Sequence, residues 1–338
     1  MTDPDCVDCV ADDELAEQEA RWQYELAEME TSTNGQRDTR HGDGVDADLR
    51  DLLDAPEPAY DWKIPNLIEA LDRVFLTGGE GDGKTTLLRQ LTLQAAAGIH
   101  PFTLENIDPL RVLYVDLENS IAQNRRAFRP LAITVGDRLA RRQLIPIIEP
   151  SGIDLLHRHG VDWLTERVDR NEPDLLIAGP VYKLANGDPT SEEMAKAVSA
   201  VLDDIRTTYG CAVIIEGHSP YGSGGKRPIR PYGASLWSRW PEFGLHLSKQ
   251  GQLLHWRGAR DERNWPAALK RGGEWPWTPE IDKRAITFAA ILEEVHAQGR
   301  RLSERDLADA LNAPKTTIHR AIQANQTQFD TACEEVDQ

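Results

Sequence analysis

The sequence has few cysteines, four in 338 residues, and no repeated spacing among them. Cys6 and Cys9 form a single CxxC pair, while Cys211 and Cys333 stand apart. A zinc site would need a second CxxC or a histidine pair, and a redox motif would need a neighbouring strand and helix. Neither accompanies Cys6 and Cys9, so we interpret them as two reduced thiols in a tail.

Long apolar runs are also missing. No segment approaches the roughly 20 apolar residues that a membrane-spanning helix requires. The N-terminus, MTDPDCVDCVADDE, is acidic where a signal peptide would be basic and then apolar. We therefore expect a cytoplasmic protein that does not contact the membrane.

Basic residues are outnumbered, and the formal net charge is −18. The imbalance lies at the two ends: residues 1–60 hold 18 acidic and 4 basic residues, and residues 330–338 hold 4 acidic residues and no basic one. The remaining residues hold 34 of each sign. The acidity thus belongs to the tails and does not exclude a nucleic acid partner for the folded part.

From about residue 60, short apolar segments alternate with helical ones. The expected strands cover 73–79, 111–118, 143–150, 174–180 and 211–218, and the clearest helices 84–98 and 191–210, the latter begun by a capping box of Thr190 and Glu193. Such alternation predicts an α/β fold with a mostly parallel sheet and helices on both faces. We predict an acidic, disordered tail and linker over 1–50, this α/β domain over 51–280, a helical module over 281–325 and an acidic tail over 326–338.

The strongest motif follows the first of these strands. It fits the pattern GxxxxGK[ST] and comprises, with the next residue, Gly78, Gly79, Glu80, Gly81, Asp82, Gly83, Lys84, Thr85 and Thr86. In this pattern the backbone N–H groups surround phosphate oxygens, the lysine neutralises the β and γ phosphates, and the Thr85 hydroxyl is offered to magnesium. The motif therefore predicts binding of ATP and Mg²⁺ at residues 78–86, which we call the phosphate loop.

The segment around this motif, IPNLIEALDRVFLTGGEGDGKTTLLRQL, resembles the RecA-like hexameric ATPases of the RepA type, the plasmid and phage replicative helicases related to DnaB. The resemblance extends over about residues 60–265. It implies a P-loop ATPase of the AAA type that assembles as a homohexamer and acts on single-stranded DNA. It also implies that the glutamate activating the attacking water is Glu118, and that a γ-phosphate sensor stands at His218.

The strand 174–180 lacks an expected acid. ATPases of this kind usually end it with an aspartate that helps to hold magnesium, but here Gly179 and Pro180 follow the apolar run. Three explanations are open: Thr85, the phosphates and water suffice for the metal; Asp116 takes the role; or hydrolysis has been lost. We assign Thr85 and Asp116 as the metal-binding pair.

Positive charge is needed in two further places. One is the transition state, where relatives supply an arginine from a neighbouring subunit. We expect two further, antiparallel strands over 242–249 and 252–259, and three arginines stand at the end of the second: Arg257, Arg260 and Arg263. Arg260 is our choice, with Lys84, Glu118 and His218 as the other catalytic residues. The other is the basic loop 223–230, in which Lys226, Arg227 and Arg230 would grip single-stranded DNA. An ordinary surface loop is the alternative.

The C-terminal segment 303–324 divides into two helices around Asn312-Ala313-Pro314, and it resembles a helix-turn-helix, with a winged form expected and 286–298 as its first helix. The face of the second helix would present Lys315, Thr316, Thr317 and Arg320 to duplex DNA. A module that contacts another replication protein is the alternative.

The resulting hypothesis is an ATP-hydrolysing, helicase-like motor. The alternatives are an ATP-controlled DNA-binding regulator and a recombination ATPase, each with slow or no turnover.

Overall fold

The computed structural model describes residues 48–54, 59–221, 227–258, 263–280, 288–311, 313 and 315–336. Predictions for residues 1–47, for Lys226 and for Arg260 lie outside these ranges. The chain divides into two units at residue 58, and the described part of the first unit is the short helix α2, Leu49–Asp54. The second unit begins at Ala59 and contains the elements below.

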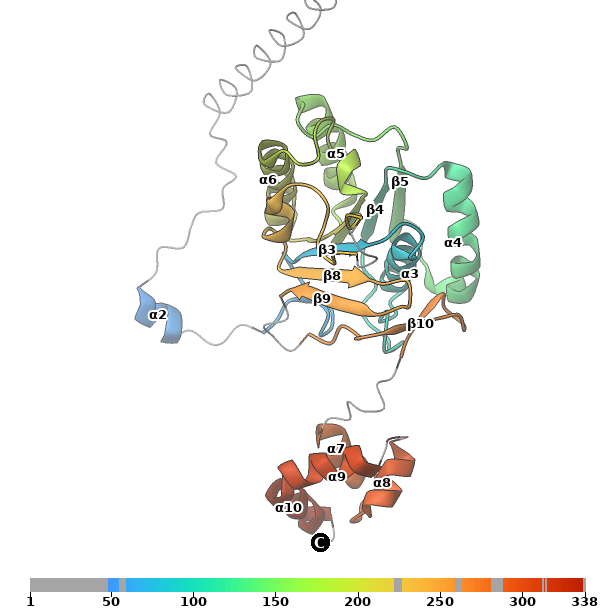
Figure 1. Ribbon diagram of the computed structural model, residues 1–338, viewed down its shortest axis with the longest axis vertical. Coiled ribbons are helices and arrows are strands. Elements are labelled where there is room, and N and C mark those ends of the chain that lie inside the picture. Colours follow the sequence, from blue (N-terminus) through green and yellow to red (C-terminus); the bar gives the residue numbers. More distant parts are fainter. Residues whose placement is uncertain are drawn as a thin grey trace, which may run out of the picture. The chain divides into compact units, whose positions relative to one another are not determined.

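A seven-stranded sheet forms the centre of the second unit, in the order β5-β4-β6-β7-β3-β8-β9. All neighbouring strands are parallel except β9, which pairs with β8 in the antiparallel direction. The predicted α/β class with a mostly parallel sheet is therefore confirmed (Figure 1). The strands are β3 (Arg73–Gly78), β4 (Val112–Asp116), β5 (Leu144–Ile148), β6 (Leu175–Gly179), β7 (Ala212–Glu216), β8 (Phe243–Leu247) and β9 (Leu253–Arg257).

Helices cover both faces of this sheet (Figure 1). Alternate residues of each strand point to opposite faces, so that Tyr114 and Ile177 pack with α3 whereas Leu113 and Leu176 pack with α5 and α6. Four helices lie around the sheet: α3 (Lys84–Ala96), α4 (Ile121–Val135), α5 (Arg158–Asn171) and α6 (Glu192–Tyr209). Helix α6 begins after Ser191, whose side chain accepts the N–H of Met194, so the cap lies one residue after the predicted Thr190.

Smaller elements complete this part of the chain. Two antiparallel pairs are β1 (Trp62–Ile64) with β2 (Ile68–Glu69), and β10 (Leu269–Arg271) with β11 (Trp277–Pro279). The described residues also form the 3₁₀ turns η1 (Gly136–Arg138), η2 (Val181–Lys183) and η4 (Ser235–Ser238). Among the described residues, no helix is both long enough and apolar enough to span a membrane.

The C-terminal module, considered by itself, has four helices: α7 (Phe288–Gln298), α8 (Glu304–Ala310), α9 (Lys315–Ala324) and α10 (Gln326–Val336). Helices α8 and α9 correspond to the two predicted helices of the helix-turn-helix. The expected acidic tail is instead α10, because its Phe329 and Cys333 are buried with Ile291 and Ile318. The described residues 288–336 contain no strand, so the predicted winged form is not found.

Candidate active site

The phosphate loop joins β3 to α3 in a preformed curve. Gly81 and Gly83 have φ values of 73° and 97°, which L side chains rarely adopt. Oδ2 of Asp82 accepts the N–H of Gly79 at 2.8 Å, and Nζ of Lys84 donates to the carbonyl of Gly79 at 3.0 Å. The glycines and Asp82 thus fix the loop, while the ammonium of Lys84 lies across it.

A hairpin far along the chain supports this loop. Arg271 of β10 donates to the carbonyl of Asp82 at 2.7 Å, and the indole N–H of Trp277 in β11 donates to the carbonyl of Gly83 at 3.2 Å. The side chain of Gln90 in α3 makes two hydrogen bonds with the backbone of Trp277. No motif in the sequence indicates this support; the one signal in the segment is its tryptophans, Trp275 and Trp277 among them.

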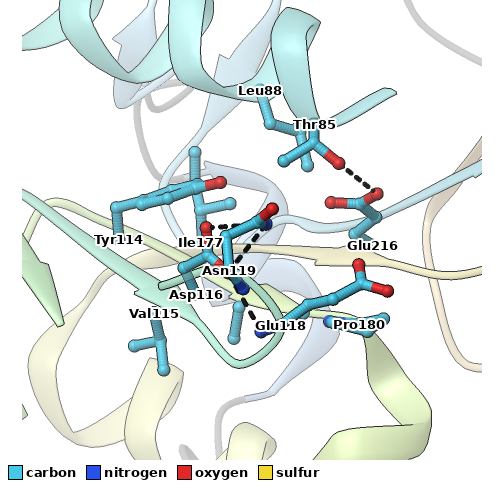
Figure 2. A pocket seen from close by; sticks show the side chains of 12 residues that line it. Thr85, Leu88, Tyr114, Val115, Asp116, Glu118, Asn119, Ile177, Pro180 and Glu216 are labelled. Carbon is cyan, nitrogen blue, oxygen red and sulfur yellow. Dashed lines mark hydrogen bonds between the residues drawn. The ribbon is translucent and has the colours of Figure 1, made fainter. Parts of the chain in front are cut away.

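Thr85 contacts an acid that the sequence interpretation did not assign. Its hydroxyl donates to Oε1 of Glu216 at 2.9 Å (Figure 2). Nζ of Lys84 lies 3.9 Å from the same oxygen. Burial raises the pKa of Glu216, and the charge of Lys84 and the hydrogen bond from Thr85 oppose that change. Burial likewise lowers the pKa of Lys84 against the opposing charge of Glu216. The end of β7 therefore brings a buried carboxyl group to the predicted magnesium ligand.

Asp116, predicted to bind the metal, is instead occupied by other partners. Its Oδ2 forms an ion pair with Nη2 of Arg89 at 2.9 Å, and its Oδ1 accepts the backbone N–H groups of Glu118 and Asn119. Burial alone would raise the pKa of Asp116, but the hydrogen bonds from Asn119 and Glu118 outweigh it and the pKa is lowered. Both carboxylate oxygens of Asp116 thus have partners within the chain, one in α3 and one in the turn after β4. Asp116 also lines the pocket that Thr85 lines, and its metal role stays a prediction.

That turn places Glu118 over the same pocket as Thr85 and Glu216 (Figure 2). We expected Glu118 to end the strand, but β4 already ends at Asp116 and Glu118 belongs to the turn that follows it. The hydroxyl of Tyr182, in η2 after β6, donates to Oε1 of Glu118 at 3.3 Å. Burial and the charge of Glu118 raise the pKa of Tyr182 to about 12, so the phenol is a neutral donor at neutral pH. Sequence reasoning did not find Tyr182.

His218, the predicted phosphate sensor, follows β7 by two residues. Its ring lies against that of Tyr182, with 5.8 Å between the ring centroids. Its Nδ1 is buried and has no hydrogen-bond partner among the described residues. Burial and then the charge of Lys84 lower its pKa, so the ring is neutral and can offer one N–H donor.

Residues 227–230 are the described part of the basic loop, and they begin beside the phosphate loop. A Cβ added to Gly79 would lie 2.8 Å from a guanidinium nitrogen of Arg227, so this arginine lies directly against the phosphate loop. Ile229 is anchored there too, because its carbonyl accepts the hydroxyl of Thr77 in β3 at 2.6 Å. Arg230 is exposed. The two arginines predicted to bind DNA thus differ: Arg227 lies against the phosphate loop, and Arg230 is exposed to solvent.

The candidate arginine fingers have unequal surroundings. Arg263 pairs with Asp72 and Glu69 and lies over the Phe243 ring, so its charge is used within the subunit. Arg257 is exposed at the end of β9 and donates to the carbonyl of Pro241. Arg260, the chosen finger, lies outside the described residues.

Helix α9 holds the residues predicted to contact duplex DNA. Lys315, Thr316 and Arg320 are exposed, and nothing is described of the side chain of Thr317. Nδ1 of His319 lies within hydrogen-bond distance of Oε1 of Glu304 in α8, at 2.8 Å. The exposed residues are thus available on one helix of the module, while the nearby histidine is held by α8.

A comparison with known protein families matches residues 39–224 to the AAA domain family AAA_25, which is more than half of the chain. The chain belongs to this AAA domain family. No curated protein matches it. Among solved structures, the KaiC-like protein PH0186 from the hyperthermophilic archaeon Pyrococcus horikoshii OT3 is similar at 17% sequence identity and a TM-score of 0.42, over 62% of this chain and 89% of that chain.

The AAA domain family confirms the prediction of a P-loop ATPase domain. The match ends at residue 224, so the supporting hairpin β10–β11 and the C-terminal module lie beyond it. No group of three or more histidine, cysteine, aspartate or glutamate side chains in the described parts of the chain is arranged to hold a metal by itself. The residues do fit a magnesium ion brought by ATP, because Thr85 and Glu216 supply one hydroxyl and one carboxylate and Mg²⁺ takes its other ligands from phosphate and water.

Proposed function

We propose that this AAA domain hydrolyses ATP and uses the energy to move along single-stranded DNA, as a RecA-like motor of the RepA and DnaB kind. The observation that carries the hydrolytic part is the position of Glu118. Its carboxylate lines the pocket that Thr85 and Glu216 also line, and the Tyr182 hydroxyl holds it there. A carboxylate fixed beside a phosphate loop can polarise a water molecule for attack on the γ-phosphate.

Different groups of the chain would bind the phosphates and activate the water. The backbone N–H groups of the phosphate loop and the ammonium of Lys84 would bind the β and γ phosphates and orient them. Glu118 would accept the proton of the attacking water. Magnesium, when bound with ATP, neutralises charge on the phosphate oxygens. His218 would donate an N–H toward the γ-phosphate, which accords with a neutral ring.

The remaining positive charge would come from a neighbouring subunit, and Arg260 remains our proposed finger, with a hexameric ring as the proposed assembly. The exposed Arg230, together with Lys226, would contact the DNA backbone. Arg227 is better supported as a contact to phosphate within the subunit, because it lies against Gly79. We propose a cytoplasmic location.

An ATP-controlled DNA-binding regulator is the second candidate function. The observation that favours it is α9, where Lys315, Thr316 and Arg320 are exposed on a helix that follows α8 as in a helix-turn-helix. In the motor, this module would bind duplex DNA or a replication protein. In the regulator, it would bind one duplex sequence tightly while ATP turnover stays slow.

ATP turnover with and without single-stranded DNA tests the proposal. We expect wild-type turnover to rise on addition of DNA, and both Lys84→Ala and Glu118→Gln to abolish it. Glu118→Gln should still bind ATP, since the substitution leaves the phosphate loop unchanged. The matched control is Glu149→Gln, a glutamate just after β5 that accepts a hydrogen bond from Ser151 and does not line the pocket.

Three results would contradict parts of this proposal. Tight ATP binding with no turnover under any condition would leave the regulator, which sequence-specific binding of duplex DNA would then support. Turnover that Glu118→Gln and Glu149→Gln reduce equally would remove Glu118 from the catalytic site. Filaments on DNA seen by electron microscopy, in place of rings, would indicate a recombination ATPase.

A further inference from the structure

The strand that lacks its acid lies beside the strand that has one. β6 ends at Gly179 and pairs with β7, where Ala178 is opposite Ile215. The next position of β7 is Glu216. Tyr114, Ile177 and Ile214 pack on the face that α3 covers, and period-two alternation places Gly179 and Glu216 on that face too. Both positions therefore point toward the helix that begins at Lys84.

A side chain at residue 179 would collide with Glu216. A Cβ built on Gly179 would lie 2.7 Å from Cβ of Glu216, 3.2 Å from its backbone nitrogen and 3.3 Å from its Cα. Real Cβ atoms essentially never approach another heavy atom within 3.0 Å, and β-strand backbone cannot move aside easily. An aspartate at residue 179 is thus incompatible with this position of Glu216, and the glycine provides the space that Glu216 occupies.

Glu216 already contacts the hydroxyl that would bind the metal. Its carboxylate accepts the Thr85 hydroxyl at 2.9 Å, which is the hydroxyl that the GK[ST] pattern offers to magnesium. The side chain is only 8% exposed and lies 3.9 Å from Nζ of Lys84. The other acids of the pocket have different tasks: Asp116 is paired with Arg89, and Glu118 is held by Tyr182.

We propose that Glu216 is the acid that holds the magnesium ion of bound ATP, reaching from the end of β7 in place of the absent aspartate at the end of β6. The proposal rests on the proposed function, in that ATP is bound at the phosphate loop. Three explanations were open for the missing acid at residue 179. In this proposal Glu216 takes the role that we had assigned to Asp116, and the absence of the aspartate does not require that hydrolysis has been lost.

The test is the magnesium dependence of nucleotide binding, which needs no turnover. A fluorescent ATP analogue is titrated into the full chain in EDTA and at increasing Mg²⁺. We expect Mg²⁺ to strengthen wild-type binding. Glu216→Gln keeps the shape and the acceptor for Thr85 but removes the charge, so the Mg²⁺ concentration for half of the effect should rise about 10- to 100-fold. Binding in EDTA should be unchanged or tighter, because a negative charge near the phosphates has gone.

Two comparisons make the result specific. Lys84→Ala should weaken binding with and without Mg²⁺, which identifies a general loss of phosphate binding. Glu242→Gln also removes a carboxylate from an ion pair, with Arg73 at the start of β3, and should leave the Mg²⁺ dependence unchanged. Thermal unfolding checks that each variant is folded. If Glu216→Gln does not fold, Glu216→Asp replaces it; withdrawing the carboxylate by one methylene should produce a smaller rise in the same Mg²⁺ concentration.

Exchanging the two residues tests the steric argument. Gly179→Asp alone should destabilise the chain because of the contact with Glu216. Glu216→Gly alone should lose the Mg²⁺ response, and Gly179→Asp with Glu216→Gly should recover part of it from the neighbouring strand.

The outcomes separate the two proposals. Wild-type protein that binds no nucleotide would overturn the proposed function. Wild-type protein that binds it, with the same half-effect Mg²⁺ concentration in folded Glu216→Gln or Glu216→Asp, would overturn the role of Glu216 alone.

Discussion

The hydroxyl of Tyr182 donates to the carboxylate of Glu118 across 3.3 Å, so a turn that follows β6 holds a side chain that follows β4. The same tyrosine ring lies against His218, which follows β7. One aromatic residue therefore connects the proposed catalytic base with the proposed phosphate sensor. Since the phenol is neutral at neutral pH, it acts by positioning Glu118 and not by exchanging protons with it.

Tyr182→Phe removes this hydrogen bond and keeps the ring contact with His218. A hydrogen bond of this kind contributes about 1 kcal/mol, so kcat should fall about fivefold while KM changes little. The matched control is Tyr209→Phe, whose hydroxyl donates to Asp169 at 3.1 Å outside the pocket. Steady-state ATPase kinetics measure both parameters. An unchanged kcat, or a rise in KM alone, would show that Tyr182 does not position the base.

Arg227→Ala tests whether this residue serves ATP or DNA. Because its guanidinium lies against Gly79, we expect affinity for a fluorescent ATP analogue to fall about tenfold, which is about 1.4 kcal/mol. The loss should be smaller for the corresponding ADP analogue, which lacks the γ-phosphate. Arg230→Ala is the control, since Arg230 belongs to the same segment and is exposed. If Arg227→Ala weakened DNA binding and left nucleotide affinity unchanged, the original DNA prediction would hold instead.

The order of strands and helices could be predicted because each is a local property of the chain. The segment 174–180 is apolar and bounded by turn residues, and β6 forms within it. The phosphate loop could be predicted for the same reason, since its glycines, lysine and threonine all lie within one short segment of the sequence. Elements of this kind follow from periodicity and turn chemistry.

The role of Glu216 could not be found in this way. Its relation to Gly179 depends on β6 and β7 being neighbours in register, with α6 between them in the chain. The ion pair of Asp116 could not be found for a similar reason: its partner Arg89 lies 27 residues earlier, and only the packing of α3 on β4 brings them together. Helix α10 was not predicted because the acidic residues of this segment indicated a tail. Two of its residues, Phe329 and Cys333, are nevertheless buried.

His100 predicts a dependence of stability on pH. Its Nδ1 accepts the N–H groups of Phe102 and Thr103, so the proton lies on Nε2, which donates to the carbonyl of Pro65 at 3.1 Å. Burial lowers the pKa of His100, with the charge of Glu105 among the opposing influences. The unfolded chain, with a histidine pKa of about 6.5, thus binds a proton first as the pH falls. The contribution is complete above about pH 6.5 and is lost progressively below it.

His100→Asn should therefore reduce the free energy of unfolding by about 1 to 2 kcal/mol at pH 7.5 and by less at pH 5.5. Denaturant titrations at the two pH values measure the difference. The other histidines contribute equally to both chains and cancel in the comparison. The exposed His159→Asn is the control and should give no difference at either pH. A destabilisation that is the same at both pH values would show that His100 does not titrate in this range.

Phe329 tests whether α10 is part of the C-terminal module. Its side chain is 3% exposed and packs among buried residues of the other three helices, including Ile291, Leu307 and Ile318. Phe329→Ala in the full chain should cost about 3 to 5 kcal/mol because it leaves a cavity, and amide hydrogen exchange over residues 288–336 should rise. Gln328→Ala, at an exposed position of the same helix, should leave exchange unchanged. Equal exchange in the two variants would mean that residues 326–336 behave as the acidic tail first predicted, because only a packed helix can lose a buried contact.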